Sequence, residues 1–75
     1  MTSDATEIIS GNLRAEIARS RRNQVELTGI WHVSAMSVSR RLQGKTKVSA
    51  QELHAAADWL GVDISVLLPQ TVGTP

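Results

Sequence analysis

The sequence predicts an all-α domain, and three features of its pattern lead to this fold class. Apolar residues recur at four-residue spacing through much of the chain, as they do on one face of a helix. Ser, Asn and Asp residues that can begin helices, and glycines that can end them, separate these apolar segments. No stretch alternates convincingly between apolar and polar residues, as a half-buried strand would. We therefore expect a compact domain of five short helices.

Length and composition limit the possible function. Seventy-five residues make one domain, near the lower limit for a self-sufficient core. With two His and no Cys, neither a disulfide nor a structural zinc site is expected, and no cofactor is implied. The two His are far apart, and the chain has neither a Gly-rich phosphate loop nor a convergent pair of carboxylates, so we expect no enzyme. The lack of a long apolar run or signal peptide predicts a cytoplasmic protein without membrane contact.

The charge is small overall but unevenly distributed. The net charge is +1, yet residues 14–47 hold all eight basic side chains and only two acidic ones, which gives this window +6. The other five acidic residues lie in the flanks. A basic middle between acidic ends is typical of a small nucleic-acid-binding domain, although a solvated charge cluster would look the same.

The first two helices are predicted from apolar spacing and capping residues. The first helix should run to about Arg21, and its apolar face is formed by residues four apart, Ile9, Leu13 and Ile17. Asn23 is a suitable N-cap for a short second helix, and Glu26 completes a pattern like a capping box. The core-facing residues of that helix, again four apart, are Leu27 and Trp31.

The remaining helices have clearer ends. Ser34 should cap a third helix from Ala35 to about Gln43, and Gly44 is the left-handed residue expected after it. Ser49 and Glu52 form a capping box that opens a fourth helix, which Gly61 should end. A short fifth helix is predicted over residues 64–68, with Asp63 as its cap. The predicted domain therefore covers residues 6–69, with flexible segments at 1–5 and 70–75.

The segment from Gln24 to Gly44 carries the most specific motif. Its two short helices are joined by about three residues, and the four apolar positions that such a pair needs are occupied by Leu27, Trp31, Val33 and Val38. At these residues the chain resembles the Cro/C1-type, XRE-like helix-turn-helix family of phage and bacterial repressors. Further matches are Leu13-Arg14 and the segment Ala57-x-x-Leu60-Gly61-Val62. The resemblance covers residues 8 to 69 and implies a five-helix, lambda-repressor-like DNA-binding domain, with helices 2 and 3 as the helix-turn-helix.

Four residues depart from the pattern of this family. His32 stands where the family usually has Gly in the turn, a position that often needs a positive φ. Thr28 replaces a usual Ala, and Arg22 stands where Leu is common. Arg41 stands at a usually apolar position, from which its guanidinium is expected to reach a phosphate while its stem is buried.

The resemblance implies two sets of DNA contacts. In this architecture the start of the third helix meets base edges in the major groove, and the corresponding residues are Ala35, Met36, Ser37, Ser39 and Arg40. Residues expected to bind phosphates are Arg22, Asn23, Gln24, Arg41, Gln43, Lys45, Thr46 and Lys47. Arg14 and Arg19 are expected to be surface charges or ion-pair partners instead.

The hypothesis from the sequence is a sequence-specific, double-stranded-DNA-binding transcriptional regulator, of the kind formed by phage or prophage Cro and immunity repressors. Such proteins usually bind an operator with inverted half-sites as dimers, and Trp59 and Leu68 are the candidate dimer contacts. The dimer would form in solution or only on DNA. Two alternatives stay open, namely an antitoxin-type regulator that also binds a toxin, and a protein-interaction module on the same fold.

Overall fold

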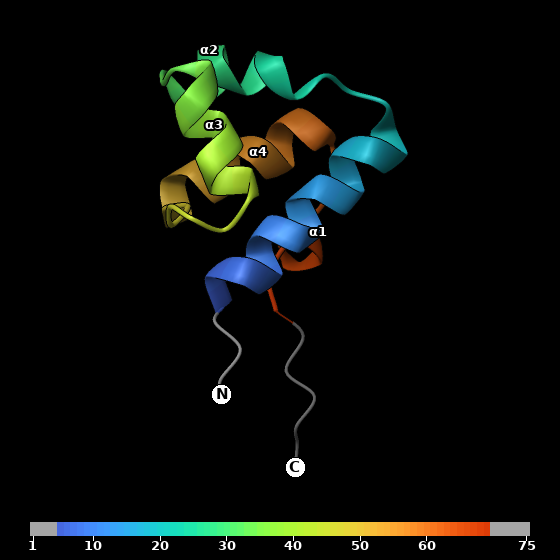
Figure 1. The fold of residues 1–75 in the computed structure, drawn as a ribbon. Coiled ribbons are helices and arrows are strands. Elements are labelled where there is room, and N and C mark those ends of the chain that lie inside the picture. The colour runs from blue at the N-terminus through green and yellow to red at the C-terminus, as the bar shows by residue number, and fades with distance from the viewer. Residues whose placement is uncertain (1–4, 70–75) are drawn as a thin grey trace.

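The computed structural model describes residues 5–69, all of its regular elements being helical. In this part of the chain there are four α-helices: α1 (Ala5–Ser20), α2 (Leu27–Trp31), α3 (Ala35–Leu42) and α4 (Ala50–Leu60). Two 3₁₀-helices, η1 (Gln24–Glu26) and η2 (Ile64–Val66), precede α2 and follow α4. Figure 1 shows α1 as the longest element, with α2 and α3 at one end of the molecule. The predicted all-α fold class is confirmed.

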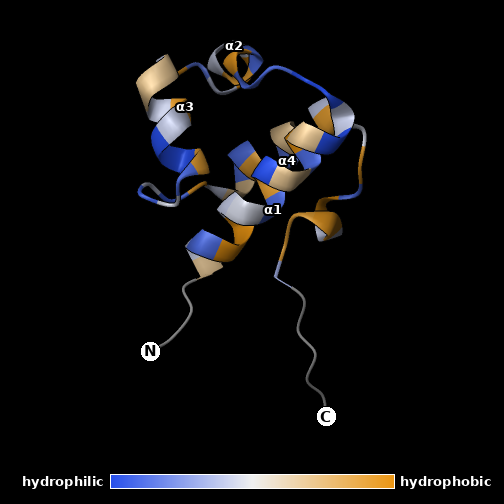
Figure 2. Cartoon of the chain, turned by 45° about the vertical axis from the view of Figure 1, so that its right-hand side comes forward, coloured by the Kyte–Doolittle hydropathy of each residue, from blue (hydrophilic) through white to orange (hydrophobic). Residues whose placement is uncertain are grey.

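One hydrophobic core joins the four α-helices. Helices α1 and α2 contribute the apolar residues predicted for them, α3 contributes Val38 and Leu42, and the core also includes Val48 and Leu67 from outside the α-helices. Ile30 is half-buried and packs against this core. Figure 2 shows hydrophobic and hydrophilic positions recurring along α1 and α4, as expected for helices that bury one face.

Helix α1 ends slightly earlier than predicted, at Ser20. Arg21 adopts a left-handed conformation with φ of 60°, and its amide donates to the carbonyl of Ala18 at 3.3 Å. The Arg22 amide donates to the carbonyl of Ile17 at 3.3 Å. These two bonds satisfy carbonyls at the helix end, and the left-handed residue turns the chain toward η1.

The second predicted helix is divided into η1 and α2. Asn23 does cap this segment, because its side chain accepts a hydrogen bond from the Val25 amide at 3.0 Å. The capping-box role predicted for Glu26 is wrong, since its carboxylate accepts a hydrogen bond from Trp59 Nε1 at 2.9 Å. The 3₁₀ turn takes up the first residues, and only Leu27–Trp31 forms α-helix.

The caps predicted for α3 and α4 are confirmed. Ser34 accepts a hydrogen bond from the Ser37 amide, and Ser49 and Glu52 form both bonds of the capping box. Gly61 and Gly44 have the positive φ expected of residues that end a helix, 73° and 81° respectively. Helices with such well-defined ends project their side chains in predictable directions.

The predicted fifth α-helix is a single 3₁₀ turn, η2, and Asp63 makes no capping hydrogen bond to it. The turn is held from outside, because Asn12 Nδ2 donates to the carbonyl of Leu67 at 3.1 Å and the Leu67 side chain is fully buried. Packing of Leu67 against the rest of the core and the Asn12 bond therefore hold this segment in addition to its own backbone hydrogen bonds.

The predicted domain, residues 6–69, lies within the described residues 5–69. Ala5, which was assigned to a flexible end, is the first residue of α1. The other residues predicted to be flexible, 1–4 and 70–75, lie outside the described part of the chain. Within residues 5–69, no helix has the length and apolarity needed to cross a bilayer. No group of three or more potential metal-ligating side chains is gathered there.

His32 provides a test of backbone strain. It follows α2 with φ 57° and ψ 46°, in the left-handed region where a Cβ atom costs energy. We predict that His32→Gly raises the free energy of unfolding by about 0.5–1 kcal/mol, because relief of this strain outweighs the extra freedom of Gly in the unfolded chain. Urea titration of both proteins measures the difference.

His32→Ala is the matched control, because it removes the imidazole and keeps the Cβ atom. It should show no such gain. Equal stabilisation by the Gly and Ala variants would mean that the imidazole, and not the backbone conformation, is unfavourable at this position.

Candidate nucleic-acid interface

Helix α3 has one buried and one exposed face. Val38 and Leu42 lie in the core, at 1% and 3% exposure. On the other side Met36 is 65% exposed, although it is one of the largest apolar side chains of the chain, and Arg40 is also exposed. Ala35 begins this exposed face, and the predicted base-reading side chains Ser37 and Ser39 lie at its half-buried margins.

The hydroxyl groups along α3 are engaged in short-range hydrogen bonds. Ser34 Oγ donates to Ser37 Oγ at 3.3 Å while accepting from the Ser37 amide. Gln43 Nε2 donates to Ser39 Oγ at 3.1 Å, so these two side chains lie side by side one turn apart. Ser37 and Ser39 retain further hydrogen-bonding capacity, since a hydroxyl both donates and accepts.

The loop after α3 folds back onto the end of that helix. The amides of Lys45 and Thr46 both donate to the carbonyl of Arg40, at 2.9 and 3.3 Å. The turn depends on Gly44, whose φ of 81° is accessible to glycine at little cost. The basic loop is thereby held directly beside the exposed face of α3.

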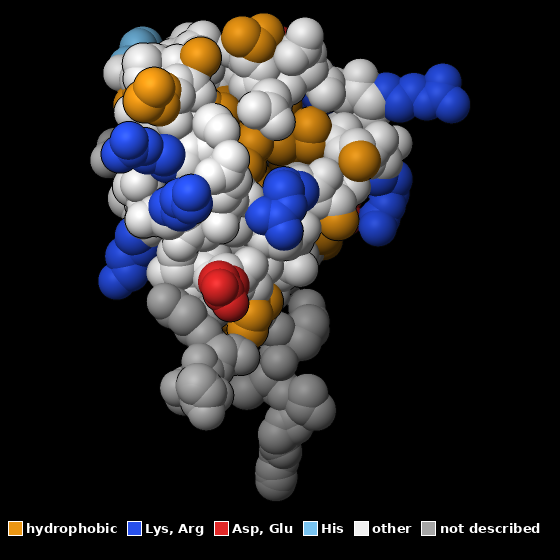
Figure 3. Space-filling model, in the orientation of Figure 1, with side chains coloured by type: hydrophobic (Ala, Val, Ile, Leu, Met, Phe, Trp, Pro, Cys, Tyr) orange, Lys and Arg blue, Asp and Glu red, His pale blue; other side chains and the backbone are white. Residues whose placement is uncertain are grey.

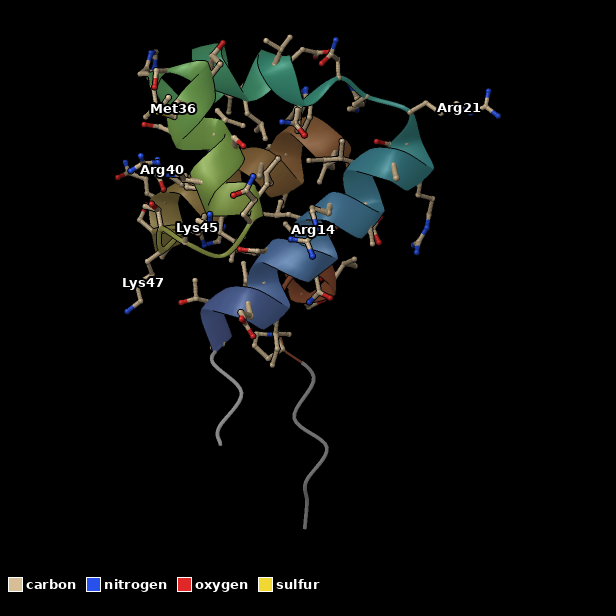
Figure 4. All side chains as sticks on the ribbon, in the orientation of Figure 1. Arg14, Arg21, Met36, Arg40, Lys45 and Lys47 are labelled. Carbon is tan, nitrogen blue, oxygen red and sulfur yellow. The ribbon has the colours of Figure 1, made fainter. Side chains whose placement is uncertain are left out.

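The exposed face and the loop together line a shallow hollow of about 340 Å³. Its walls consist of residues that the sequence predicted to contact DNA: Met36, Ser39, Arg40, Gln43, Lys45 and Thr46. Figure 4 shows Met36, Arg40, Lys45 and Lys47 following one side of the molecule, from the start of α3 to the loop beyond it. The structure thus gathers predicted base-reading and phosphate-binding residues into one surface.

Basic side chains predominate on this side of the molecule, as the space-filling view in Figure 3 shows. They continue from α3 and its loop onto α1, where Arg14 lies (Figure 4). Arg21, in contrast, points away at the far end of α1 (Figure 4). The basic window of the sequence is therefore divided in space, and its middle part accompanies α3.

The predicted phosphate-binding residues before α2 have different surroundings. Gln24 is exposed at the start of η1, while the Asn23 carboxamide caps that turn. The Arg22 guanidinium lies 5.7 Å from the centroid of the Trp59 ring, a cation–π contact. Since the Trp59 indole N–H is bonded to Glu26, these side chains connect the start of η1 to the end of α4.

Arg41 lies in an intramolecular network and does not extend freely into solvent. Its Nε and Nη2 atoms donate to the two oxygens of Glu52 at 3.1 and 3.2 Å. Its Nη1 donates to the carbonyl of Ser37, and its guanidinium carbon lies 5.9 Å from the centre of the Trp31 ring. The side chain is 16% exposed. The structure therefore assigns Arg41 an internal contact where the sequence suggested a phosphate contact.

The two residues predicted as dimer contacts differ in exposure. Trp59 is half-buried and hydrogen-bonded within the chain. Leu68 is 37% exposed, and Val66 and Ile8 are similarly exposed. The C-terminal segment therefore retains some exposed apolar surface.

Solved structures show which proteins share this fold. The clp gene regulator ClgR from Corynebacterium glutamicum matches with a TM-score of 0.78 and 23% identity, covering 88% of this chain and 86% of that one. The DNA-binding domain of BldD matches with a TM-score of 0.73 and 25% identity, covering 92% and 100%. The SOS-response transcriptional repressor LexA from Eubacterium rectale matches with 0.74 and 25%, covering 100% and 85%. The fold is therefore that of helical domains found in DNA-binding regulators.

Sequence comparisons add nothing to these structural matches. No family model matches the chain, and no curated protein matches it in sequence.

Sequence reasoning missed two polar residues that support α3. Ser10 Oγ donates to the carbonyl of Arg41 at 2.6 Å, and Arg14 Nη1 donates to the carbonyl of Leu42. Arg14 was expected to be a surface charge or an ion-pair partner. Spacing along α1 was the available signal, because Ser10 and Arg14 lie four residues apart and share one helix face. That face could not be matched to α3 before the arrangement of the helices was known.

Glu52 links the surface to the rest of the domain. Burial by itself would raise the pKa of its carboxyl, but hydrogen bonds from Arg41 and Ser49 and the charge of Arg41 lower it. The net result is a pKa below the ordinary value of 4.5. The folded state therefore favours the ionised carboxylate. Its contribution to stability is complete above the unfolded-state pKa and is lost as pH falls through the folded-state pKa.

We predict that Glu52→Gln lowers the free energy of unfolding by about 1 kcal/mol near neutral pH, because the charge-assisted bonds to Arg41 are weakened. The difference in free energy of unfolding between this variant and the unchanged protein should shrink as pH falls below 4.5, the ordinary carboxyl pKa, and through the lower pKa of Glu52 in the folded state. Urea titrations of both proteins at several pH values measure this difference in the free energy of unfolding.

Arg41→Gln tests whether the ion pair causes this pH dependence. It should flatten the acid side of the stability profile as Glu52→Gln does. A profile that stays as steep as that of the unchanged protein in both variants would show that other groups are responsible.

Proposed function

We propose that this protein is a sequence-specific double-stranded-DNA-binding transcriptional regulator of the Cro/C1 repressor kind. In this proposal α2 and α3 form the helix-turn-helix, and α3 enters the major groove. The observation that carries it is the exposed face of α3, which is continuous with a backbone-anchored basic loop. The fold shared with the DNA-binding domain of BldD and with the repressor LexA supports the same function.

Base recognition would come from the first two turns of α3. Arg40 is exposed there and can make a bidentate contact to guanine O6 and N7. Met36 and Ala35 offer apolar contacts suited to thymine methyl groups. Met36 is 65% exposed and lies beside Arg40 in the hollow lined by α3 and its loop, where both can reach the same ligand.

Phosphate contacts would come from both sides of α3. Lys45, Thr46 and Lys47 follow it, and Gln24 begins η1 before it. Such contacts set the position of the domain on the duplex without reading sequence. Arg22 and Asn23 would add phosphate contacts next to Gln24. Each also has a partner within the chain, Trp59 for Arg22 and the Val25 amide for Asn23.

A repressor of this kind would act on an operator with two inverted half-sites. Their centres would lie about 34–36 Å apart, so that two copies of the domain meet one face of the DNA. Leu68, which is exposed, and Trp59, which is half-buried, are the proposed contacts between the copies. A contact surface between the copies as small as this one would be favoured when both copies bind adjacent half-sites.

Selection of binding sites from random duplexes tests the proposal. We expect enrichment of a short motif, and an affinity that falls steeply as salt rises because phosphate contacts release counterions. The selection is carried out at two salt concentrations with the full chain. Equal recovery of all sequences would refute sequence-specific recognition even if the chain binds DNA.

The roles within the surface are separated by two substitutions. Arg40→Ala should cost about 1–3 kcal/mol on the preferred site and remove the preference at one base pair. Lys47→Ala should weaken all sequences nearly equally and lower the slope of log affinity against log salt by about 0.9. Fluorescence anisotropy with specific and scrambled duplexes measures both. Even weakening of every duplex by Arg40→Ala would contradict its role in base reading.

A further inference from the structure

Helix α1 meets the C-terminal end of α3 along a polar stripe. Glu7, Ser10 and Arg14 are spaced three and four residues apart, so they lie on one face of α1. All three approach the last turn of α3 or the glycine after it. A Cβ atom built on Gly44 would lie 3.5 Å from Glu7 Cα and 3.8 Å from Ser10 Oγ, so the closing turn of α3 rests closely against α1.

Ser10 is the centre of this contact. It is fully buried, and its hydroxyl donates to the carbonyl of Arg41 at 2.6 Å, across 31 residues of sequence. Carbonyls at the end of a helix carry partial negative charge, and that of Arg41 also accepts from the Gly44 amide at 3.2 Å, so Ser10 adds a second donor to it. Arg14 places its guanidinium on the next carbonyl, that of Leu42. Two consecutive carbonyls of α3 are thus bound by side chains of α1.

These bonds constrain α3 in a way that apolar contacts do not. Val38 and Leu42 hold the helix against the core, but apolar packing is non-directional and tolerates small rotations about the helix axis. Hydrogen bonds depend steeply on angle. Arg40, the proposed guanine-reading residue, directly precedes Arg41, whose carbonyl Ser10 binds. A rotation of α3 would therefore displace Arg40 directly.

We infer that Ser10 is a positioning residue for base recognition, which sets the rotation of α3 and thereby the discrimination between DNA sequences. The inference rests on the proposed function. Ser10 cannot touch DNA itself because it is fully buried, and it carries no charge. It therefore affects specificity without affecting the electrostatic attraction between the domain and DNA. Recognition geometry must be held within about 0.5 Å and 10–20° to be effective, which is the scale that a single directional bond controls.

The test is the ratio of affinities for the selected duplex and a scrambled duplex. We expect Ser10→Ala to lower this ratio about tenfold, within the range that one bidentate base contact provides, while affinity for the scrambled duplex and the salt slope stay unchanged. The matched control is Ser20→Ala, which removes a hydroxyl bonded at 3.1 Å to the carbonyl of Ile17 within α1 itself. This control should keep the ratio.

A second pair of variants covers the case in which Ser10→Ala fails to fold. Arg14→Met and Arg19→Met each remove one positive charge from α1, and the affinity of each variant for the scrambled duplex measures its own electrostatic loss. Only Arg14→Met breaks a bond to α3, whereas Arg19 pairs with Glu16 within α1. We expect the affinity ratio to fall for Arg14→Met alone.

The outcomes separate this inference from the proposed function. If the unchanged protein selects no motif, the proposed function is refuted and the inference with it. If it selects a motif and Ser10→Ala, folded by circular dichroism, keeps the same ratio as Ser20→Ala, only the inference is refuted. Equal ratios for Arg14→Met and Arg19→Met would likewise overturn it.

Discussion

The arrangement of the helices depends on Glu52, a residue of α4 that bonds to both α2 and α3. Its carboxylate accepts from Arg41 in α3 and from the Ser49 amide at the start of α4, and its backbone carbonyl accepts from Trp31 Nε1 at the end of α2 at 2.8 Å. A helix of five residues such as α2 is too short to be stable in isolation. Its orientation must come from contacts like these, and the buried Leu27 and Trp31 supply the accompanying apolar area.

The Glu52 network and the α1 stripe hold α3 from different directions. Arg41 provides both attachments, because its side chain bonds to Glu52 while its carbonyl accepts from Ser10. The exposed face of α3 is left without such contacts to neighbouring helices. In a domain of this size a small apolar core is supplemented by directional polar bonds, which give the helices a defined orientation at little cost in volume.

Most of the helices could be predicted from sequence because their signals are local. The caps at Ser34, Ser49 and Gly61 act within one helical turn. Four-residue apolar spacing identified core residues in α1 and α2. Contacts between distant residues could not be predicted in this way. Glu26 suited a capping box but bonds to Trp59, 33 residues away. The C-terminal segment has a helix-like pattern, yet it contains only a 3₁₀ turn held by Asn12 and the core. The same distinction holds for the candidate interface. The position of α3 and of its loop could be predicted from local signals, whereas the internal contacts of Arg41 and the support from Ser10 depend on other helices.

The division of α3 into two faces has a consequence for how such a domain diversifies. The side chains that hold the helix are those of Val38, Leu42 and Arg41. The backbone carbonyls that α1 binds also hold it, and a carbonyl is present whatever the side chain. Ala35, Met36 and Arg40 point outward and take no part in the core. Because surface substitutions away from such features change stability by only about ±0.5 kcal/mol, these positions can vary without unfolding the protein. A family of chains that differ only there would share one scaffold while presenting different surfaces to their partners.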